Sequence, residues 1–437
     1  MFFRVVRMMA LALGVCLAYG ARAEPIQIQW WHSHPSDSLI GKTMERFAEE
    51  FNASQAKYQV VATYKGTYYE TLNATIAAYR AKKQPAITEV LGNLTLTMML
   101  SGAIVPVEDL VKESGYQIDW ADFIPSVLNI YRDPSGKIVS MPFNASAPIL
   151  WINRDAFDKA GIEGSPQTWT EVGEAARKLK AAGYPCGFTV SWQIYSQVEA
   201  YSFANDIPLA TEANGMDGFN VKLLFNKTSL VNHISQLQDW AKEGIFTYTG
   251  RSWQGANEAF YSQKCPMFIE SSAGLGGITT NAKFRFDAAP YPSEPGVKQL
   301  NTQVGGGSMY VMKGFSPEVY KGVAEFFAFL ATPEKQFDWH DKSGYVPITR
   351  KAYEYASEKQ YYKQKPIQEI AIKQLLRGPQ TDNSRGFRIG DYGKITDILD
   401  EELENIWSQK KTAQQGLDDA VRRGDEVIQR FVRAARL

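Results

Sequence analysis

Small hydroxyl residues and glycines gather in a few short segments of this 437-residue sequence. Pro-Phe-Asn-Ala-Ser-Ala-Pro occupies 142–148, Glu-Ser-Ser occupies 270–272, and Gly-Gly-Gly-Ser occupies 305–308. The first segment has the composition of a turn, and the Ile-Leu-Trp-Ile run that follows it predicts a buried strand. Such loops at strand ends offer backbone N–H groups and hydroxyls to an anion or a polyol. The sequence therefore predicts a polar binding site made by loops.

Residues that commonly bind metals or catalyse reactions are sparse. There are four histidines, and the His32–His34 pair has no third ligand group in view, so a polar loop is favoured over a metal site. Ser271 lacks the glycine two positions earlier that a nucleophile elbow requires. No Walker A lysine or spaced dinucleotide-binding glycine motif occurs, and no pair of carboxylates stands out as a glycosidase dyad. These features favour binding without turnover, with no cofactor and no metal.

Strands and helices are predicted to alternate in the first hundred residues. Strands are expected over 26–31, 58–64 and 86–91, and helices over 39–53 and 71–82. This alternation favours an α/β architecture with a largely parallel sheet. In such sheets ligands bind in the loops at the carboxyl ends of the strands.

Further elements are predicted along the rest of the chain. Thr168 and Glu171 form a capping box that begins a helix, which Gly183 ends. Another helix is expected over 230–243, and an apolar strand over 309–312 follows the glycine run. Helices are also expected over 322–330 and 333–340, and most of the chain from 352 onwards should be helical.

The N-terminus carries the features of an export signal. Arg4 and Arg7 precede an apolar run too short to span a bilayer, and an A-x-A cleavage site occupies 21–23. Residues 1–23 are therefore predicted to be a signal peptide, although Cys16 stays open as a lipid attachment point. No run of about 20 apolar residues follows. The remaining chain has 44 basic and 47 acidic residues and no basic stripe, so a nucleic-acid partner is not expected.

Two cysteines, Cys186 and Cys265, remain after the predicted cleavage site. In an oxidising compartment they could form a disulfide. They could equally be two separate buried thiols, because the sequence does not give the distance between them.

Several collinear segments resemble one family, the extracellular solute-binding proteins of ABC importers (family 1), and within it the members that bind sn-glycerol 3-phosphate. The similarity runs from Trp-Trp-His-Ser at 30–33 to the last helix. It includes Tyr-Lys-Gly-Thr-Tyr at 64–68, Gln-Thr-Trp at 167–169, Gly-Tyr-Val-Pro at 344–347 and Gly-Phe-Arg-Ile-Gly at 386–390, besides the three segments described first.

The resemblance implies an α/β, two-lobed periplasmic-binding-protein fold of type II, like that of maltose-binding proteins, with a ligand cleft between the lobes. The 437-residue length agrees with two lobes. Residues 24–143 plus 305–346 would form the N-terminal lobe, and 144–304 plus 347–437 the C-terminal lobe. The implied partners are a small-molecule solute and a membrane permease with its cytoplasmic ATPase, served by a periplasmic monomer.

The resemblance also implies a set of ligand-binding residues. Tyr68 corresponds to a tyrosine that contacts the glycerol end of the ligand. Ser146, Ser271, the Gly306 amide and Tyr345 correspond to groups around the phosphate. In addition, Trp169 corresponds to an aromatic residue of the cleft wall.

Two positions depart from the family pattern. Gly92 stands where an acidic residue would contact the glycerol hydroxyls, and Thr396 stands where an arginine would contact the phosphate. Arg388 or Lys394 could supply the missing charge, or could be solvated or paired elsewhere. The expected function is capture of sn-glycerol 3-phosphate or a glycerophosphodiester for import. An uncharged polyol or oligosaccharide is the main alternative ligand, and an exported phosphodiester hydrolase is the alternative from another class.

Overall fold

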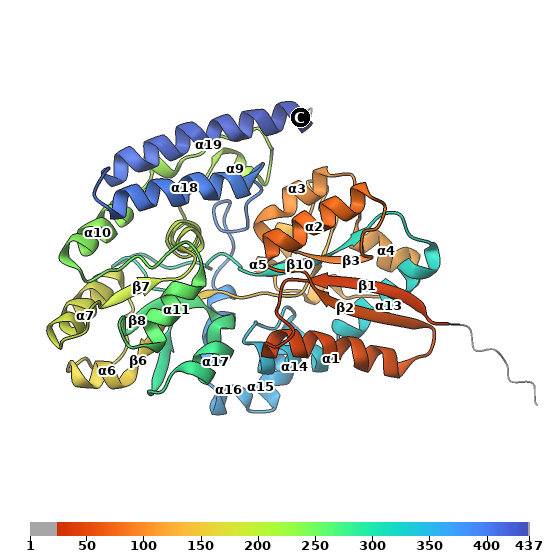
Figure 1. Cartoon of the computed structure of the whole chain (residues 1–437), viewed down its shortest axis with the longest axis horizontal. Coiled ribbons are helices and arrows are strands. Elements are labelled where there is room, and N and C mark those ends of the chain that lie inside the picture. The colour runs from red at the N-terminus through yellow and green to blue at the C-terminus, as the bar shows by residue number, and fades with distance from the viewer. Residues whose placement is uncertain (1–23, 436–437) are drawn as a thin grey trace, which may run out of the picture.

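The computed structural model describes residues 24–435, which form two α/β lobes that lie side by side (Figure 1). The predicted signal peptide, with Cys16, lies outside the described residues. Between residues 24 and 435 no helix is both long enough and apolar enough to cross a bilayer.

The first lobe is built on a mixed sheet with the order β2-β1-β3-β10-β4, and β5 pairs with β10. Strands β1, β2 and β3 are parallel, whereas β10 is antiparallel to β3, β4 and β5. The strands are β1 (Ile26–His32), β2 (Tyr58–Tyr64), β3 (Ile87–Leu91), β4 (Ile104–Val105), β5 (Met141–Pro142) and β10 (Gly307–Met312). The helices around it are α1 (Leu39–Ser54), α2 (Tyr68–Arg80), α3 (Thr95–Leu100), α4 (Val107–Glu113), α5 (Pro125–Leu128), α13 (Pro317–Leu330), α14 (Pro333–Ser343), α15 (Arg350–Glu358) and α16 (Tyr361–Gln364).

The second lobe is built on a four-stranded sheet with the order β7-β8-β6-β9. Strands β7 and β8 are parallel, and β6 is antiparallel to both of its neighbours. The strands are β6 (Pro148–Asn153), β7 (Phe188–Val190), β8 (Met267–Ser271) and β9 (Phe286–Ala289). The helices are α6 (Arg154–Lys159), α7 (Trp169–Ala181), α8 (Ala200–Ala204), α9 (Thr211–Gly215), α10 (Leu230–Glu243), α11 (Trp253–Tyr261), α12 (Leu275–Asn281), α17 (Ile367–Leu375), α18 (Tyr392–Trp407) and α19 (Ala413–Ala435).

The prediction of a largely parallel sheet is therefore only partly correct. Strands β6 and β10 begin at the edge of their sheets that faces the other lobe, because each is entered directly from a crossing segment. The neighbouring strands β3 and β8 end at that same edge. Strands β6 and β10 therefore run antiparallel to β8 and β3. As a result, the carboxyl ends of β3 and β8 lie beside the segments that lead into β10 and β6.

Local capping signals set the helices that carry candidate residues. The predicted capping box of α7 is present between Thr168 and Glu171, and α10 ends at Gly244 in a left-handed conformation. Helix α2 begins three residues earlier than predicted, because Thr67 and Glu70 form a second capping box. Tyr68 is consequently the first residue of a helix and is held at the edge of the first sheet.

Two of the segments that cross between the lobes, those containing Ser146 and Gly305, lie side by side. The Ser146 N–H donates to the Gly305 carbonyl at 3.1 Å, and the Gly305 N–H donates to the Ser146 carbonyl at 2.9 Å. One hydrophobic cluster fills the second lobe. A second cluster includes Trp30 of the first sheet and continues to Trp151 and Phe268 of the second. The lobe boundaries remain a prediction, which the membership of the strands in the two sheets supports. Helices α15 and α16, however, pack beside α14 of the first lobe, whereas the prediction assigned all residues from 347 onwards to the second.

Cys186 and Cys265 are joined by a disulfide, with their Cα atoms 4.9 Å apart. They precede β7 and β8 respectively, so the bond links the amino ends of two adjacent parallel strands. Of the two alternatives that the sequence left open, the structure has the disulfide.

Candidate functional site

Four of the predicted residues come from different parts of the fold and meet between the lobes. Tyr68 begins α2, and Tyr345 lies on the loop after α14. Ser146 lies on the first crossing segment. Ser271 is the last residue of β8 in the second lobe, and it pairs with Pro148, the first residue of β6. The hydroxyl oxygens of Tyr68 and Tyr345 are 3.4 Å apart. The site is thus assembled from both lobes and the segments that join them.

The first-lobe side of the site is held by a carboxylate that the sequence reading did not identify. Glu89 on β3 is fully buried and accepts from the Ser33 N–H at 2.8 Å and the Ser33 hydroxyl at 2.9 Å. Its other oxygen accepts from the Asn144 amide and lies 3.4 Å from His34 Nε2. Burial would raise the pKa of Glu89, but the nearby charge of His34 and these hydrogen bonds outweigh it, so that its pKa lies below the ordinary value.

The consequence of this arrangement is a fixed acceptor in the cleft. The Asn144 Nδ2 group donates to Glu89 and lies 3.3 Å from the Tyr68 hydroxyl. The amide oxygen, Asn144 Oδ1, is buried and has no hydrogen-bond partner within residues 24–435. A buried acceptor without a partner is costly, which favours a donor supplied by a ligand.

The second-lobe side contains Ser271 and a second unidentified carboxylate, Glu270. The Ser271 N–H donates to Glu270 Oε1 at 2.6 Å, and the Ser271 hydroxyl accepts from the Ala273 N–H at 3.2 Å. Burial raises the pKa of Glu270 to about 7, against the opposing effects of Ser191 and of the Ser271 N–H. Glu270 Oε2 is buried, and none of the described residues is hydrogen-bonded to it.

Tyr345 lies close to both carboxylates. Burial raises the pKa of Tyr345, and the charges of Glu89 and Glu270 add to this effect. Its ring stacks on Trp339 with centroids 5.5 Å apart. A phenol with a raised pKa stays protonated and remains a hydrogen-bond donor at neutral pH.

Gly306 lies on the second crossing segment, where a side chain would not fit. Its φ is +94°, and a Cβ atom there would lie 2.0 Å from the Asn144 carbonyl oxygen. We expect Gly306→Ala to lower the free energy of unfolding by about 3 kcal/mol, from backbone strain together with this clash, and to displace the crossing segments. Chemical denaturation measures the first effect and calorimetric solute titration the second.

Gly136 provides a matched control for this substitution. Its φ is +89°, but a Cβ atom there would meet nothing within 4 Å. Gly136→Ala should therefore cost only the backbone strain, about 1 kcal/mol. Equal effects of the two substitutions would contradict a close approach at Gly306.

The structure corrects the assignment of Trp169 to the cleft wall. Trp169 is fully buried in the core of the second lobe, where its ring lies 4.5 Å from that of His233 and 5.5 Å from that of Tyr291. As the first residue of α7, it packs under the helix that its capping box begins. A tryptophan directly after a helix N-cap can occupy such a core position as readily as a position in a cleft wall.

Trp192 is an aromatic residue at the cleft edge that the sequence analysis missed. It follows Ser191, whose N–H donates to the Ile269 carbonyl at 2.9 Å, so Trp192 lies beside the carboxyl end of β8. Its side chain is 39% exposed, and its φ is +49°, which is unusual for a bulky residue. Backbone strain of this kind is found at ligand-binding positions. No local signal in the sequence marks it.

The remaining predicted positions have other contacts. The Gly92 N–H donates to the Gly306 carbonyl at 3.1 Å, and the Thr396 hydroxyl donates to the Gly393 carbonyl at 2.7 Å. Arg388 is buried, and its guanidinium donates to backbone carbonyls of Met216 and Asn129. Burial lowers the pKa of Arg388 to about 10. Lys394 pairs with Asp391 at the surface. Both cations are thus engaged elsewhere.

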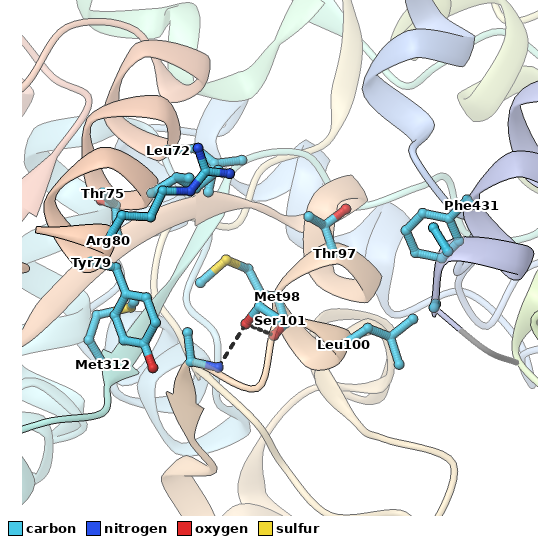
Figure 2. A pocket seen from close by; sticks show the side chains of 14 residues that line it. Leu72, Thr75, Tyr79, Arg80, Thr97, Met98, Leu100, Ser101, Met312 and Phe431 are labelled. Atoms are coloured by element: carbon cyan, nitrogen blue, oxygen red, sulfur yellow. Dashed lines mark hydrogen bonds between the residues drawn. The ribbon is translucent and has the colours of Figure 1, made fainter.

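A separate pocket of about 430 Å³ lies between α2, α3 and the end of α19. Figure 2 shows Tyr79 of α2 and Phe431 of α19 on opposite sides of it. Its walls are mostly apolar, and it contains none of the predicted site residues. No group of three or more His, Cys, Asp or Glu residues in the described chain is placed to hold a metal ion.

Two α/β lobes that are joined by crossing segments, with polar side chains of both lobes meeting beside those segments, are the architecture of an extracellular solute-binding protein. The sequence model of the bacterial extracellular solute-binding proteins matches residues 46–368, and the chain belongs to this family.

Among its relatives are the sn-glycerol-3-phosphate-binding periplasmic proteins UgpB. The UgpB of Escherichia coli K12 is 42% identical over 432 residues, which cover 98% of each chain. UgpB from Mycobacterium tuberculosis, solved in complex with glycerophosphocholine, is 21% identical, has a TM-score of 0.76 and covers 93% of this chain and 99% of that one. Maltose-bound MalE3 from T. maritima is 15% identical, has a TM-score of 0.74 and covers 91% and 99%. The family and the two-lobed fold class expected from the sequence are confirmed.

Proposed function

We propose that this protein is the solute-binding component of an ABC importer and that its two lobes close on sn-glycerol 3-phosphate or a glycerophosphodiester. The observation that carries the proposal is the convergence of Tyr68, Ser146, Ser271 and Tyr345 between the lobes. Hydroxyl and amide groups of this kind bind a polar solute without an acid–base pair. Closure would follow from contacts that only the closed form makes.

The ligand class is proposed from the relatives and the site together. The 42% identity with glycerol-3-phosphate-binding proteins favours a glycerol phosphate. A polyol or oligosaccharide is the second candidate, because the unpartnered buried acceptors Asn144 Oδ1 and Glu270 Oε2 suit hydroxyl donors. The proposed ligand residues remain Tyr68, Ser146, Ser271, the Gly306 amide and Tyr345, to which we add Trp192.

We further propose that the protein is exported through residues 1–23, acts in the periplasm as a monomer, and releases its ligand unaltered to a permease with a cytoplasmic ATPase. A hydrolase would instead turn over its ligand. Incubation with glycerophosphocholine followed by measurement of free choline distinguishes the two, since steady release of choline would contradict a receptor.

The site is tested by removing two hydroxyls that belong to opposite lobes. The Ser271→Ala, Tyr345→Phe double variant should bind glycerophosphocholine at least about tenfold more weakly, because two hydrogen bonds to the ligand are lost. Isothermal titration calorimetry measures the affinity.

The matched control removes the same two groups from the surface. Ser262→Ala with Tyr64→Phe should leave the affinity unchanged, because both residues are exposed, Tyr64 to 40%, and neither hydroxyl contacts a proposed ligand residue. Unchanged affinity in the double variant of Ser271 and Tyr345 would show that the site is misplaced.

A further inference from the structure

Three buried carboxylates surround the candidate site. Glu89 belongs to the first lobe, and Glu199 and Glu270 belong to the second; none is more than 3% exposed. Burial raises the pKa of Tyr195, and the charges of Glu199 and Glu270 add to this effect, so both carboxylates are close to Tyr195. Tyr345 is close to both Glu89 and Glu270, whose charges also raise its pKa.

The groups that lower the pKa values of Glu199 and Glu270, against the effect of burial, are all neutral. The pKa of Glu270 is raised by burial to about 7, and only Ser191 and the Ser271 N–H act against this. The pKa of Glu199 is also raised by burial to about 7, and only Tyr392 and Gln303 oppose it. No lysine or arginine of residues 24–435 contributes to either value.

The buried guanidinium of Arg388 points away from the site. Arg388 donates to the backbone carbonyls of Asn129 and Met216. His34 lies at the site itself, where its Nε2 atom contacts Glu89, Asn144 and the Tyr68 hydroxyl. Four buried side-chain atoms near the site have no hydrogen-bond partner in the described chain, and all are acceptors or hydroxyls: Asn144 Oδ1, Glu270 Oε2, Gln303 Oε1 and Tyr195 Oη.

This arrangement is unfavourable for a doubly charged phosphate. A phosphate monoester at neutral pH carries nearly two negative charges, and buried charges of like sign repel strongly at short range. Hydroxyl groups of a solute can instead donate to the amide oxygen of Asn144 and the carboxyl group of Glu270, which satisfies acceptors that are otherwise costly to bury.

We infer that the site selects a solute that donates hydroxyl groups to Asn144 and Glu270 and carries no phosphate monoester. Glycerophosphodiesters and neutral polyols share this chemistry, and sn-glycerol 3-phosphate does not. The inference deepens the proposed function and rests on it. Glu270 is accordingly the residue that determines specificity against the dianion.

Calorimetric titration of the mature protein at pH 7.5 tests this selectivity. The probes are sn-glycerol 3-phosphate, glycerophosphoglycerol and sorbitol, which represent the monoester, the diester and the neutral polyol. At least one of the last two should bind about tenfold or more tightly than sn-glycerol 3-phosphate. Which of the two binds identifies the source of the hydroxyl groups.

The substitution Glu270→Gln provides the second arm. It removes the negative charge but keeps the size of the side chain, so binding of sn-glycerol 3-phosphate should tighten by about tenfold. Glu258→Gln makes the same chemical change on the exposed face of α11 and should change nothing.

The outcomes separate the inference from the function on which it rests. Tighter binding of sn-glycerol 3-phosphate than of both other probes would overturn the inference and leave the proposed function intact. No effect of Glu270→Gln on the preference would also overturn the inference. Binding of none of the three probes by folded protein would overturn the proposed function, and the inference with it.

Discussion

Replacement of Cys186 and Cys265 by alanine is expected to lower the free energy of unfolding by about 4.5 kcal/mol. The disulfide closes a loop with a sequence separation of 79 residues, and the loss of loop-closure entropy in the unfolded chain gives this magnitude. Both cysteines are buried beside Ala259 in a small apolar cluster. Alanine is also apolar, so the double substitution leaves no polar side-chain group buried without a partner. Urea unfolding followed by tryptophan fluorescence reports on the second lobe, because Trp169 and Trp240 lie in its core.

The control for this prediction is chemical reduction. Wild-type protein in a strong thiol reductant should unfold at the urea concentration at which the alanine variant unfolds, and the variant should not respond to the reductant. A variant as stable as the oxidised wild type would show that the bond contributes nothing to the unfolded-state entropy. Solute affinity should change little, since the bond lies at the amino ends of β7 and β8, away from Ser271.

The second large effect concerns pH. Glu199 and Glu270 have folded-state pKa values raised to about 7 by burial, from 4.5. Between these values the folded protein binds protons that the unfolded chain has lost, so the free energy of unfolding falls as pH rises from about 4.5 to about 7. Each group contributes at most about 3 kcal/mol to this fall. Urea unfolding at pH 5 and at pH 8 measures it.

The substitution Glu270→Gln separates one carboxyl group from the rest of the titration. Glu199 and Glu270 together cause part of the fall in the free energy of unfolding with rising pH. The variant should lose about half of that part, because glutamine does not titrate. Glu258→Gln should retain the whole slope, since Glu258 is exposed. Identical slopes in the wild type and Glu270→Gln would contradict a buried, protonated Glu270.

Local signals in the sequence were sufficient for many elements. The strand at 58–64 and the helix at 230–243 were predicted with the bounds that the structure has, because apolar periodicity, turn residues and Gly244 all mark them. The capping box of Thr168 and Glu171 is present for the same reason. Such signals depend on neighbours within a few residues.

The rest of the site depends on contacts that are distant in sequence. Nothing near Glu89 or Glu270 shows that the residue is buried, since each follows an apolar strand pattern in which a carboxylate would usually face solvent. Their roles appear only when Asn144 and Tyr345 are brought beside them by the fold. The error at Trp169 has the same origin, because a tryptophan at a helix start can face the core or the cleft.

The crossing segments have a consequence for ligands that do not activate import. Ser146 and Gly305 exchange the backbone hydrogen bonds that join two of the crossing segments to each other, so the floor of the site is also the axis about which the lobes would rotate. A compound that contacts only this floor makes the same contacts in the open and the closed arrangement. It would occupy the protein without favouring closure and would act as a competitive antagonist of uptake.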